Sequence, residues 1–125
     1  MAKYELAEEY YKKANELRLE YYNPVTRYNY QKLKEILDKR GIKLVCVQYP
    51  VRSVEPLKKI FNVQERITFV DNEKLFKDAL KNAKYKYKEY FIDMIGGDFG
   101  HCTTKGNRLL AENIANVILK DLFKK

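Results

Sequence analysis

Two short apolar runs rich in β-branched residues limit the folds open to this chain. Residues 42–48 and 67–70 have the length and composition of buried strands. Helical periodicity surrounds them and predicts helices at residues 3–21, 26–39, 53–61, 73–83 and 105–122. Strands that alternate with helices indicate an α/β fold whose strands run parallel. Because two parallel strands do not make a stable sheet, we expect a partner or upstream sequence to complete it.

Capping signals place the ends of some of these helices. Asn23 and Pro24 end the first helix, because the residue before a proline is pushed out of the helical conformation. Thr26 is expected to cap the second helix through its hydroxyl group. Ser53 is expected to cap the short third helix in the same way.

Charge and composition narrow the classes of function. The chain has 125 residues, which fits one domain, and 46% of them are hydrophobic, which is enough for a core. The net charge is +8, but the lysines are mixed with Glu and Asp along the helical stretches. That pattern is typical of solvated helix faces, and no RNA-binding or zinc-finger signature accompanies it. A nucleic-acid partner is therefore not favoured.

Cysteine number and hydropathy bear on the compartment. Two cysteines are too few for a disulfide framework, which favours a reducing compartment. No apolar run approaches the length of a membrane span, and the N-terminus lacks the apolar core of a secretory signal. We therefore expect a cytoplasmic protein with no membrane segment. That expectation does not hold if the chain is the end of a longer protein.

A glycine-rich segment at residues 96–107 holds the only histidine, His101. Asp98 precedes it by three positions, and Gly97 and Gly100 permit a turn that brings the carboxylate to the imidazole. Serine-type hydrolysis needs such a base, with a carboxylate on its second ring nitrogen. By spacing alone, the simpler interpretation is a glycine-rich connection in which Asp98 and His101 make local hydrogen bonds.

The wider segment resembles the last conserved block of the SGNH (GDSL-type) hydrolases. In that block an Asp-x-x-His pair precedes a small or Thr residue, a Gly, and an apolar helix. The matching residues here are Phe91-x-Asp93, Gly97-Asp98-Phe99-Gly100-His101-Cys102-Thr103, Gly106-Asn107 and Leu109-x-Ala111-x-Asn113-Ile114. The resemblance covers roughly residues 26–122 and is strongest over 91–118. It implies a partial, helix-rich flavodoxin-like unit of three layers with few parallel strands.

This resemblance implies roles for two residues. His101 would be the general base and Asp98 the residue that orients it. The reaction would be hydrolysis of an ester or acyl bond, in an acylated small molecule or glycan, through an acyl-enzyme and without metal or organic cofactor. The chain lacks the family's Gly-Asp-Ser nucleophile block and its oxyanion blocks. It therefore resembles the C-terminal half of a hydrolase, inactive alone, whose partner is an N-terminal half or a second copy.

Ser53 is the only serine in the chain and so the one candidate for a serine nucleophile. It follows a strand and opens a helix, where active sites form in α/β folds. The sequence Val51-Arg52-Ser53 lacks the glycine of a strained nucleophile turn, and helix capping is the simpler role. Cys102 adjoins His101, and since neighbouring side chains rarely face each other, a Cys–His pair is less favoured still.

The first helix suggests a different function. Residues 7–17 resemble the second helix of a tetratricopeptide repeat, although no second copy follows. We assign residues 1–22 to an amphipathic helix whose apolar face contains tyrosines and Leu17, and residues 23–125 to the hydrolase-like domain. The alternative function is a non-catalytic interaction module, derived from such a hydrolase, in which this helix binds a partner.

Overall fold

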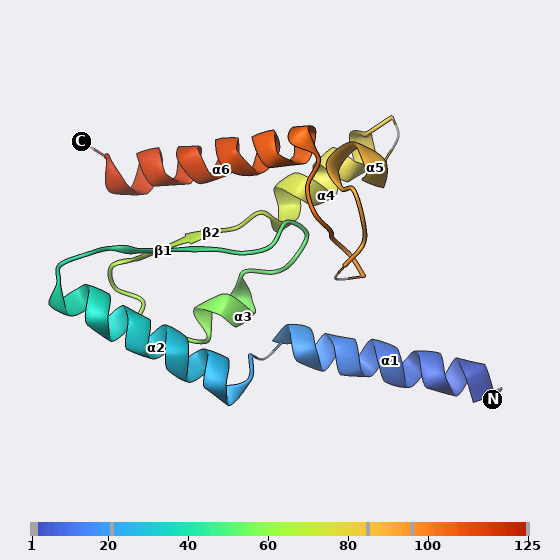
Figure 1. Cartoon of the computed structure of the whole chain (residues 1–125), viewed down its shortest axis with the longest axis horizontal. Helices are drawn as coiled ribbons and strands as arrows, with labels where there is room; N and C mark the ends of the chain where they lie inside the picture. The colour runs from blue at the N-terminus through green and yellow to red at the C-terminus, as the bar shows by residue number, and fades with distance from the viewer. Residues whose placement is uncertain (1–2, 21, 85, 96, 125) are drawn as a thin grey trace.

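The structure is a computed structural model that describes residues 3–20, 22–84, 86–95 and 97–124 (Figure 1). Its elements are, in chain order, α1 (Lys3–Glu20), α2 (Pro24–Lys39), β1 (Leu44–Val47), α3 (Glu55–Lys58), β2 (Ile67–Val70), α4 (Glu73–Asn82), α5 (Tyr87–Tyr90) and α6 (Thr104–Leu122). This is the helix-rich α/β architecture that the sequence predicts, with one small parallel sheet.

The sheet has helices on both faces. β1 and β2 pair in parallel, and the register sets Leu44 beside Ile67 and Val47 beside Val70. In Figure 1, α6 runs along one face of the two strands, while α2 and α3 lie on the other. Parallel strands need cover on both faces because their residues are apolar on both sides. The predicted parallel pairing of the two strands is confirmed, and the first strand, expected over residues 42–48, is shorter than expected.

The second edge of β1 has no strand beside it among the described residues. The backbone amides of Leu44 and Gln48 donate to carbonyl groups of Arg66 and Val70, at 3.2 and 3.1 Å. Every second residue of β1 therefore turns its backbone amide and carbonyl toward β2. Val45 and Val47 therefore turn their amides and carbonyls to the opposite edge. The side chain of Val47 is also 42% exposed. An edge of this kind is a site where a further strand can pair.

One hydrophobic cluster lies between the sheet and the helices α2 and α3. Its buried members are Leu44, Cys46, Leu57, Ile60 and Phe61. The Phe61 ring meets Tyr30 of α2 and Phe69 of β2, each with ring centroids 6.1 Å apart. These aromatic contacts hold the crossover between the two strands against the sheet.

A second cluster joins α4, α5 and α6 and supports the glycine-rich segment. Phe76 of α4 is fully buried, stacks on Phe91 with centroids 5.8 Å apart, and meets Tyr90 edge-on at 6.3 Å. Phe91 also forms an isolated antiparallel bridge with Cys102. The loop between these two residues is therefore closed at its base and anchored in the core.

Two predicted caps differ from the structure. Asn23, not Thr26, caps α2, because the Asn23 side-chain oxygen accepts the Thr26 amide at 2.8 Å and the helix already begins at Pro24. A proline at the first helical position loses nothing, since its missing N–H would have no partner there. Val54 occupies the cap position of α3, while the Ser53 hydroxyl accepts the Glu55 amide at 3.2 Å.

α1 is a helix, as predicted, but its apolar residues face solvent. Tyr4 is 89% exposed, Tyr11 is 79% exposed and Leu17 is 53% exposed. The helix contacts α3 and extends away from the sheet (Figure 1). Within the described ranges, none of the helices combines the length and the apolarity that crossing a bilayer requires.

Candidate functional site

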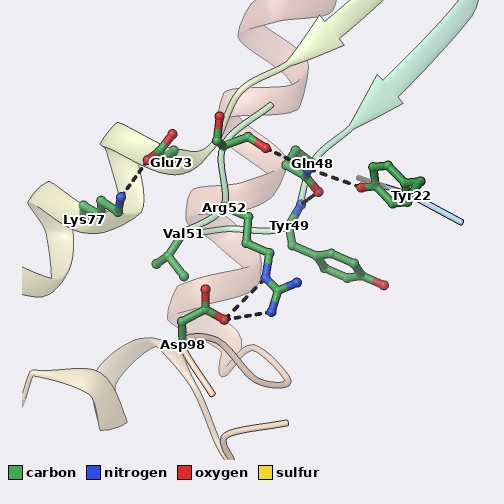
Figure 2. A pocket seen from close by; sticks show the side chains of 9 residues that line it. Tyr22, Gln48, Tyr49, Val51, Arg52, Glu73, Lys77 and Asp98 are labelled. Carbon is green, nitrogen blue, oxygen red and sulfur yellow. Dashed lines mark hydrogen bonds and ion pairs between the residues drawn. The ribbon is translucent and has the colours of Figure 1, made fainter. Parts of the chain in front are cut away.

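The carboxyl ends of β1 and β2 open onto a pocket of about 540 Å³ (Figure 2). Its wall comes from Tyr22 ahead of α2, from the residues that follow β1, from the first turns of α4, and from Asp98 in the glycine-rich loop. Ligands of α/β sheets bind beyond the carboxyl ends of the strands, where loops from different strands meet. The position of this pocket therefore agrees with the rim on which the sequence placed Ser53.

One buried amide side chain, Gln48, lines this pocket, and hydrogen bonds connect it to further amide side chains outside the pocket wall. Gln48 is 5% exposed, donates to the Ser53 carbonyl at 2.9 Å, and accepts the Tyr49 amide at 2.9 Å. Asn72 is fully buried and donates to the Gln48 carbonyl at 2.8 Å. Its oxygen accepts a hydrogen bond from Asn113 of α6 at 2.7 Å. These bonds link the ends of both strands to α6. The sequence does not predict them, because hydrogen bonds between buried amide groups leave no periodic pattern along the chain.

Asp98 pairs with Arg52 in the pocket wall. Its Oδ1 lies 3.2 Å from Arg52 Nη2 and 3.4 Å from Nε (Figure 2). The Arg52 guanidinium also lies over the Phe99 ring, 4.8 Å from its centroid, and Phe99 stacks on Tyr49 at 4.6 Å. The Arg52 side chain is only 17% exposed, so this is a partly desolvated ion pair.

His101 pairs with Asp93, and this corrects the expected contact with Asp98. Asp93 Oδ2 lies 2.6 Å from His101 Nδ1, and Asp93 Oδ1 accepts the His101 backbone amide at 2.8 Å. The antiparallel bridge between Phe91 and Cys102 is the physical reason, since it sets Asp93 opposite Gly100 and so beside His101. The sequence shows Asp93 in Phe91-x-Asp93, but its position eight residues before His101 gave no reason to choose it over Asp98 as the partner of the imidazole.

Ser53 and His101 are not brought together. Ser53 lines the pocket, and its hydroxyl accepts the Glu55 amide. The His101 side chain is 70% exposed and is not part of the described pocket wall. No hydrogen bond joins the two side chains in the part of the chain that the structure describes. Among the described residues, the arrangement positions the imidazole of His101 through Asp93 and leaves the Ser53 hydroxyl apart from it.

The two cysteines are poor candidates for covalent chemistry. Burial raises the pKa of the Cys46 thiol to about 11, and burial also raises the pKa of Cys102. A thiol with a raised pKa holds little thiolate, which is the nucleophilic form, at neutral pH. Among the described residues, no group of three or more His, Cys, Asp or Glu side chains gathers where it could hold a metal ion.

Asp93 is expected to titrate below the usual range. The hydrogen bond from the His101 side chain, followed by the bond from the His101 amide, lowers the pKa of the Asp93 carboxyl. A carboxyl whose pKa is lower in the folded state stabilises the fold above its unfolded pKa, and loses this effect as pH falls through the folded pKa. We therefore expect His101→Ala to raise the Asp93 titration midpoint, measured by carboxyl-carbon NMR.

Unfolding experiments give the matching stability test. The loss of stability in His101→Ala should be present above the ordinary Asp pKa and should shrink as the solution is acidified through the folded Asp93 pKa. A midpoint for Asp93 that is the same in the two proteins would contradict the pairing.

Comparison with protein-family models, with curated proteins and with solved structures finds no match for this chain. The resemblance to SGNH hydrolases stays a prediction that rests on the residues quoted for it. The function is therefore best argued from the geometry around His101.

Proposed function

We propose that this chain carries the acid–base part of a serine-type ester hydrolase of the SGNH kind, and that a segment with a Gly-Asp-Ser strand supplies the nucleophile. The observation that carries the proposal is the carboxylate of Asp93, 2.6 Å from Nδ1 of His101. A carboxylate at Nδ1 keeps the proton there and leaves Nε2 to take a proton from a hydroxyl group. Nε2 makes no hydrogen bond to the described residues.

The open edge of β1 supports the need for such a segment. A further parallel strand beside Val45 and Val47 would extend the sheet toward the flavodoxin-like arrangement that the resemblance implies. The carboxyl end of that strand would then lie at the same rim as the pocket, where catalytic groups collect. A second copy of this chain does not supply the nucleophile, because the sequence contains no Gly-Asp-Ser.

The experiment compares the chain alone with the chain joined to that segment. The coding sequence upstream is read for a Gly-Asp-Ser strand, and the continuous or co-expressed product is assayed with p-nitrophenyl acetate. We expect turnover by the combined product and none by the chain alone above the level of its His101→Ala variant. The physical reason is that an oriented base accelerates acyl transfer only where a hydroxyl lies within hydrogen-bond reach.

Ser53→Ala is the control in both forms. Since the Ser53 hydroxyl already accepts the Glu55 amide, its loss should leave turnover by the combined product unchanged. Turnover by the chain alone that Ser53→Ala abolishes would make Ser53 the nucleophile and overturn the proposed division of roles.

The exposed face of α1 supports a second function, a non-catalytic interaction module derived from such a hydrolase. Tyr4 and Tyr11 are among the most exposed aromatic side chains of the described residues, and aromatic side chains are enriched at protein interfaces. The hydrolase assay separates the two proposals. A combined product that contains Gly-Asp-Ser and shows no turnover would favour the interaction module.

A further inference from the structure

Asp93 holds residue 101 through both of its carboxylate oxygens. Oδ1 accepts the backbone amide of His101 at 2.8 Å, and Oδ2 faces Nδ1 of the same residue at 2.6 Å. A backbone amide can only donate a hydrogen bond, so the atom that faces it must be an acceptor. The ionised carboxylate is an acceptor at both positions, and it therefore requires a proton on Nδ1.

Neighbouring residues keep Asp93 and His101 in this contact. A β-carbon on Gly100 would lie 1.8 Å from the Asp93 carbonyl oxygen and 2.4 Å from Oδ1, so a larger residue at this position would displace Asp93. The Tyr87 hydroxyl donates to the same carbonyl at 2.6 Å, and the Ile92 amide donates to the His101 carbonyl at 2.8 Å. Tyr87, Ile92 and Gly100 thus hold the residues that carry the carboxylate and the imidazole in one arrangement.

Asp98 is occupied elsewhere. Its hydrogen bonds in the described structure go to Arg52, whose guanidinium lies against Phe99 in the pocket wall. Turning Asp98 toward His101 would break a partly buried ion pair, and leaving a charge in such a place without its counter-ion is costly. Asp98 therefore has a structural role in the pocket wall, where it holds Arg52.

We propose that Asp93 is the positioning residue that sets the tautomer of His101, and that Asp98 instead holds Arg52 in the pocket wall. The catalytic meaning of this assignment rests on the proposed hydrolase function, because the tautomer matters only if Nε2 acts as a base. The assignment of the tautomer itself rests on the contacts of Asp93 alone.

The tautomer is measured directly by long-range ¹H–¹⁵N NMR of the imidazole. The chain has one histidine, so its spectrum contains a single imidazole pattern. The measurement is made at a mildly alkaline pH, above the ordinary titration range of an imidazole. We expect the wild-type protein to carry its proton on Nδ1.

Asp93→Asn should move the proton to Nε2. The asparagine oxygen must face the His101 backbone amide, which can only donate, and so the asparagine NH₂ group must face Nδ1 and donate to it. Asp98→Asn is the matched control, since it makes the same chemical change three residues from the histidine. We expect it to leave the proton on Nδ1.

Each outcome decides the assignment. A proton on Nε2 in the wild-type protein, or a change of tautomer in Asp98→Asn, would overturn the assignment. Both of these measurements can be made even if the Asp93→Asn variant does not fold. These results are independent of turnover. A combined product that shows no hydrolysis while the tautomer behaves as expected would overturn the hydrolase function and leave the role of Asp93 intact.

Discussion

Under the proposed hydrolase function, His101→Ala in the combined product should lower kcat for p-nitrophenyl acetate by about 10⁴-fold or more, the order of effect that loss of the base has in serine proteases. The loss corresponds to roughly 5–6 kcal/mol in the activation barrier. The reason is that the proton of the attacking hydroxyl would have no acceptor other than water. The measurement is the steady-state rate of nitrophenolate release at neutral pH.

The two aspartates provide matched variants for the same assay. Asp93→Asn should approach the effect of His101→Ala, because an imidazole with its proton on Nε2 cannot accept another there. Asp98→Asn should cost far less, since it disturbs Arg52 and leaves the partner of His101 in place. A loss of less than about tenfold in His101→Ala would contradict a base role.

Phe76→Ala should destabilise the folded protein by about 3–5 kcal/mol, the usual cost of removing a buried phenylalanine. The side chain is fully buried and contacts both Phe91 and Tyr90, so its loss leaves a cavity under the base of the glycine-rich loop. Because small domains are stable by only about 5–15 kcal/mol, this change removes a large part of the total. Urea unfolding followed by circular dichroism measures it.

Leu75→Ala is the control for that experiment. Leu75 is the preceding residue on the same helix and is 37% exposed, so its truncation removes much less buried apolar surface. We expect a cost below about 1.5 kcal/mol. Equal costs for the two variants would mean that the second cluster is not packed around Phe76.

Local patterns accounted for most of the secondary structure. The strand at residues 67–70 and the end of the second helix at Lys39 lie where the sequence predicts them, because apolar periodicity and β-branched composition act over a few residues. The sequence predicted the wrong cap for α2, because Asn and Thr are both favourable at a helix N-cap. The structure shows that Asn23 is the cap, since its side-chain oxygen accepts the Thr26 amide.

The candidate site was predicted only in part. His101 follows from composition, since it is the only histidine in the chain. Its partner does not, because Asp93 and Asp98 are both near it in sequence and spacing favours Asp98. The antiparallel bridge between Phe91 and Cys102 selected Asp93 by placing it opposite Gly100, next to the histidine.

The sequence by itself determined the alternation of helices and two parallel strands, the identity of the one possible histidine base, and the lack of a Gly-Asp-Ser block. Tertiary structure alone decided which carboxylate meets His101 and which meets Arg52. The physical reason is the range of the forces. Periodicity and capping depend on neighbours within a few residues, whereas the placement of a carboxylate depends on how the chain folds back on itself.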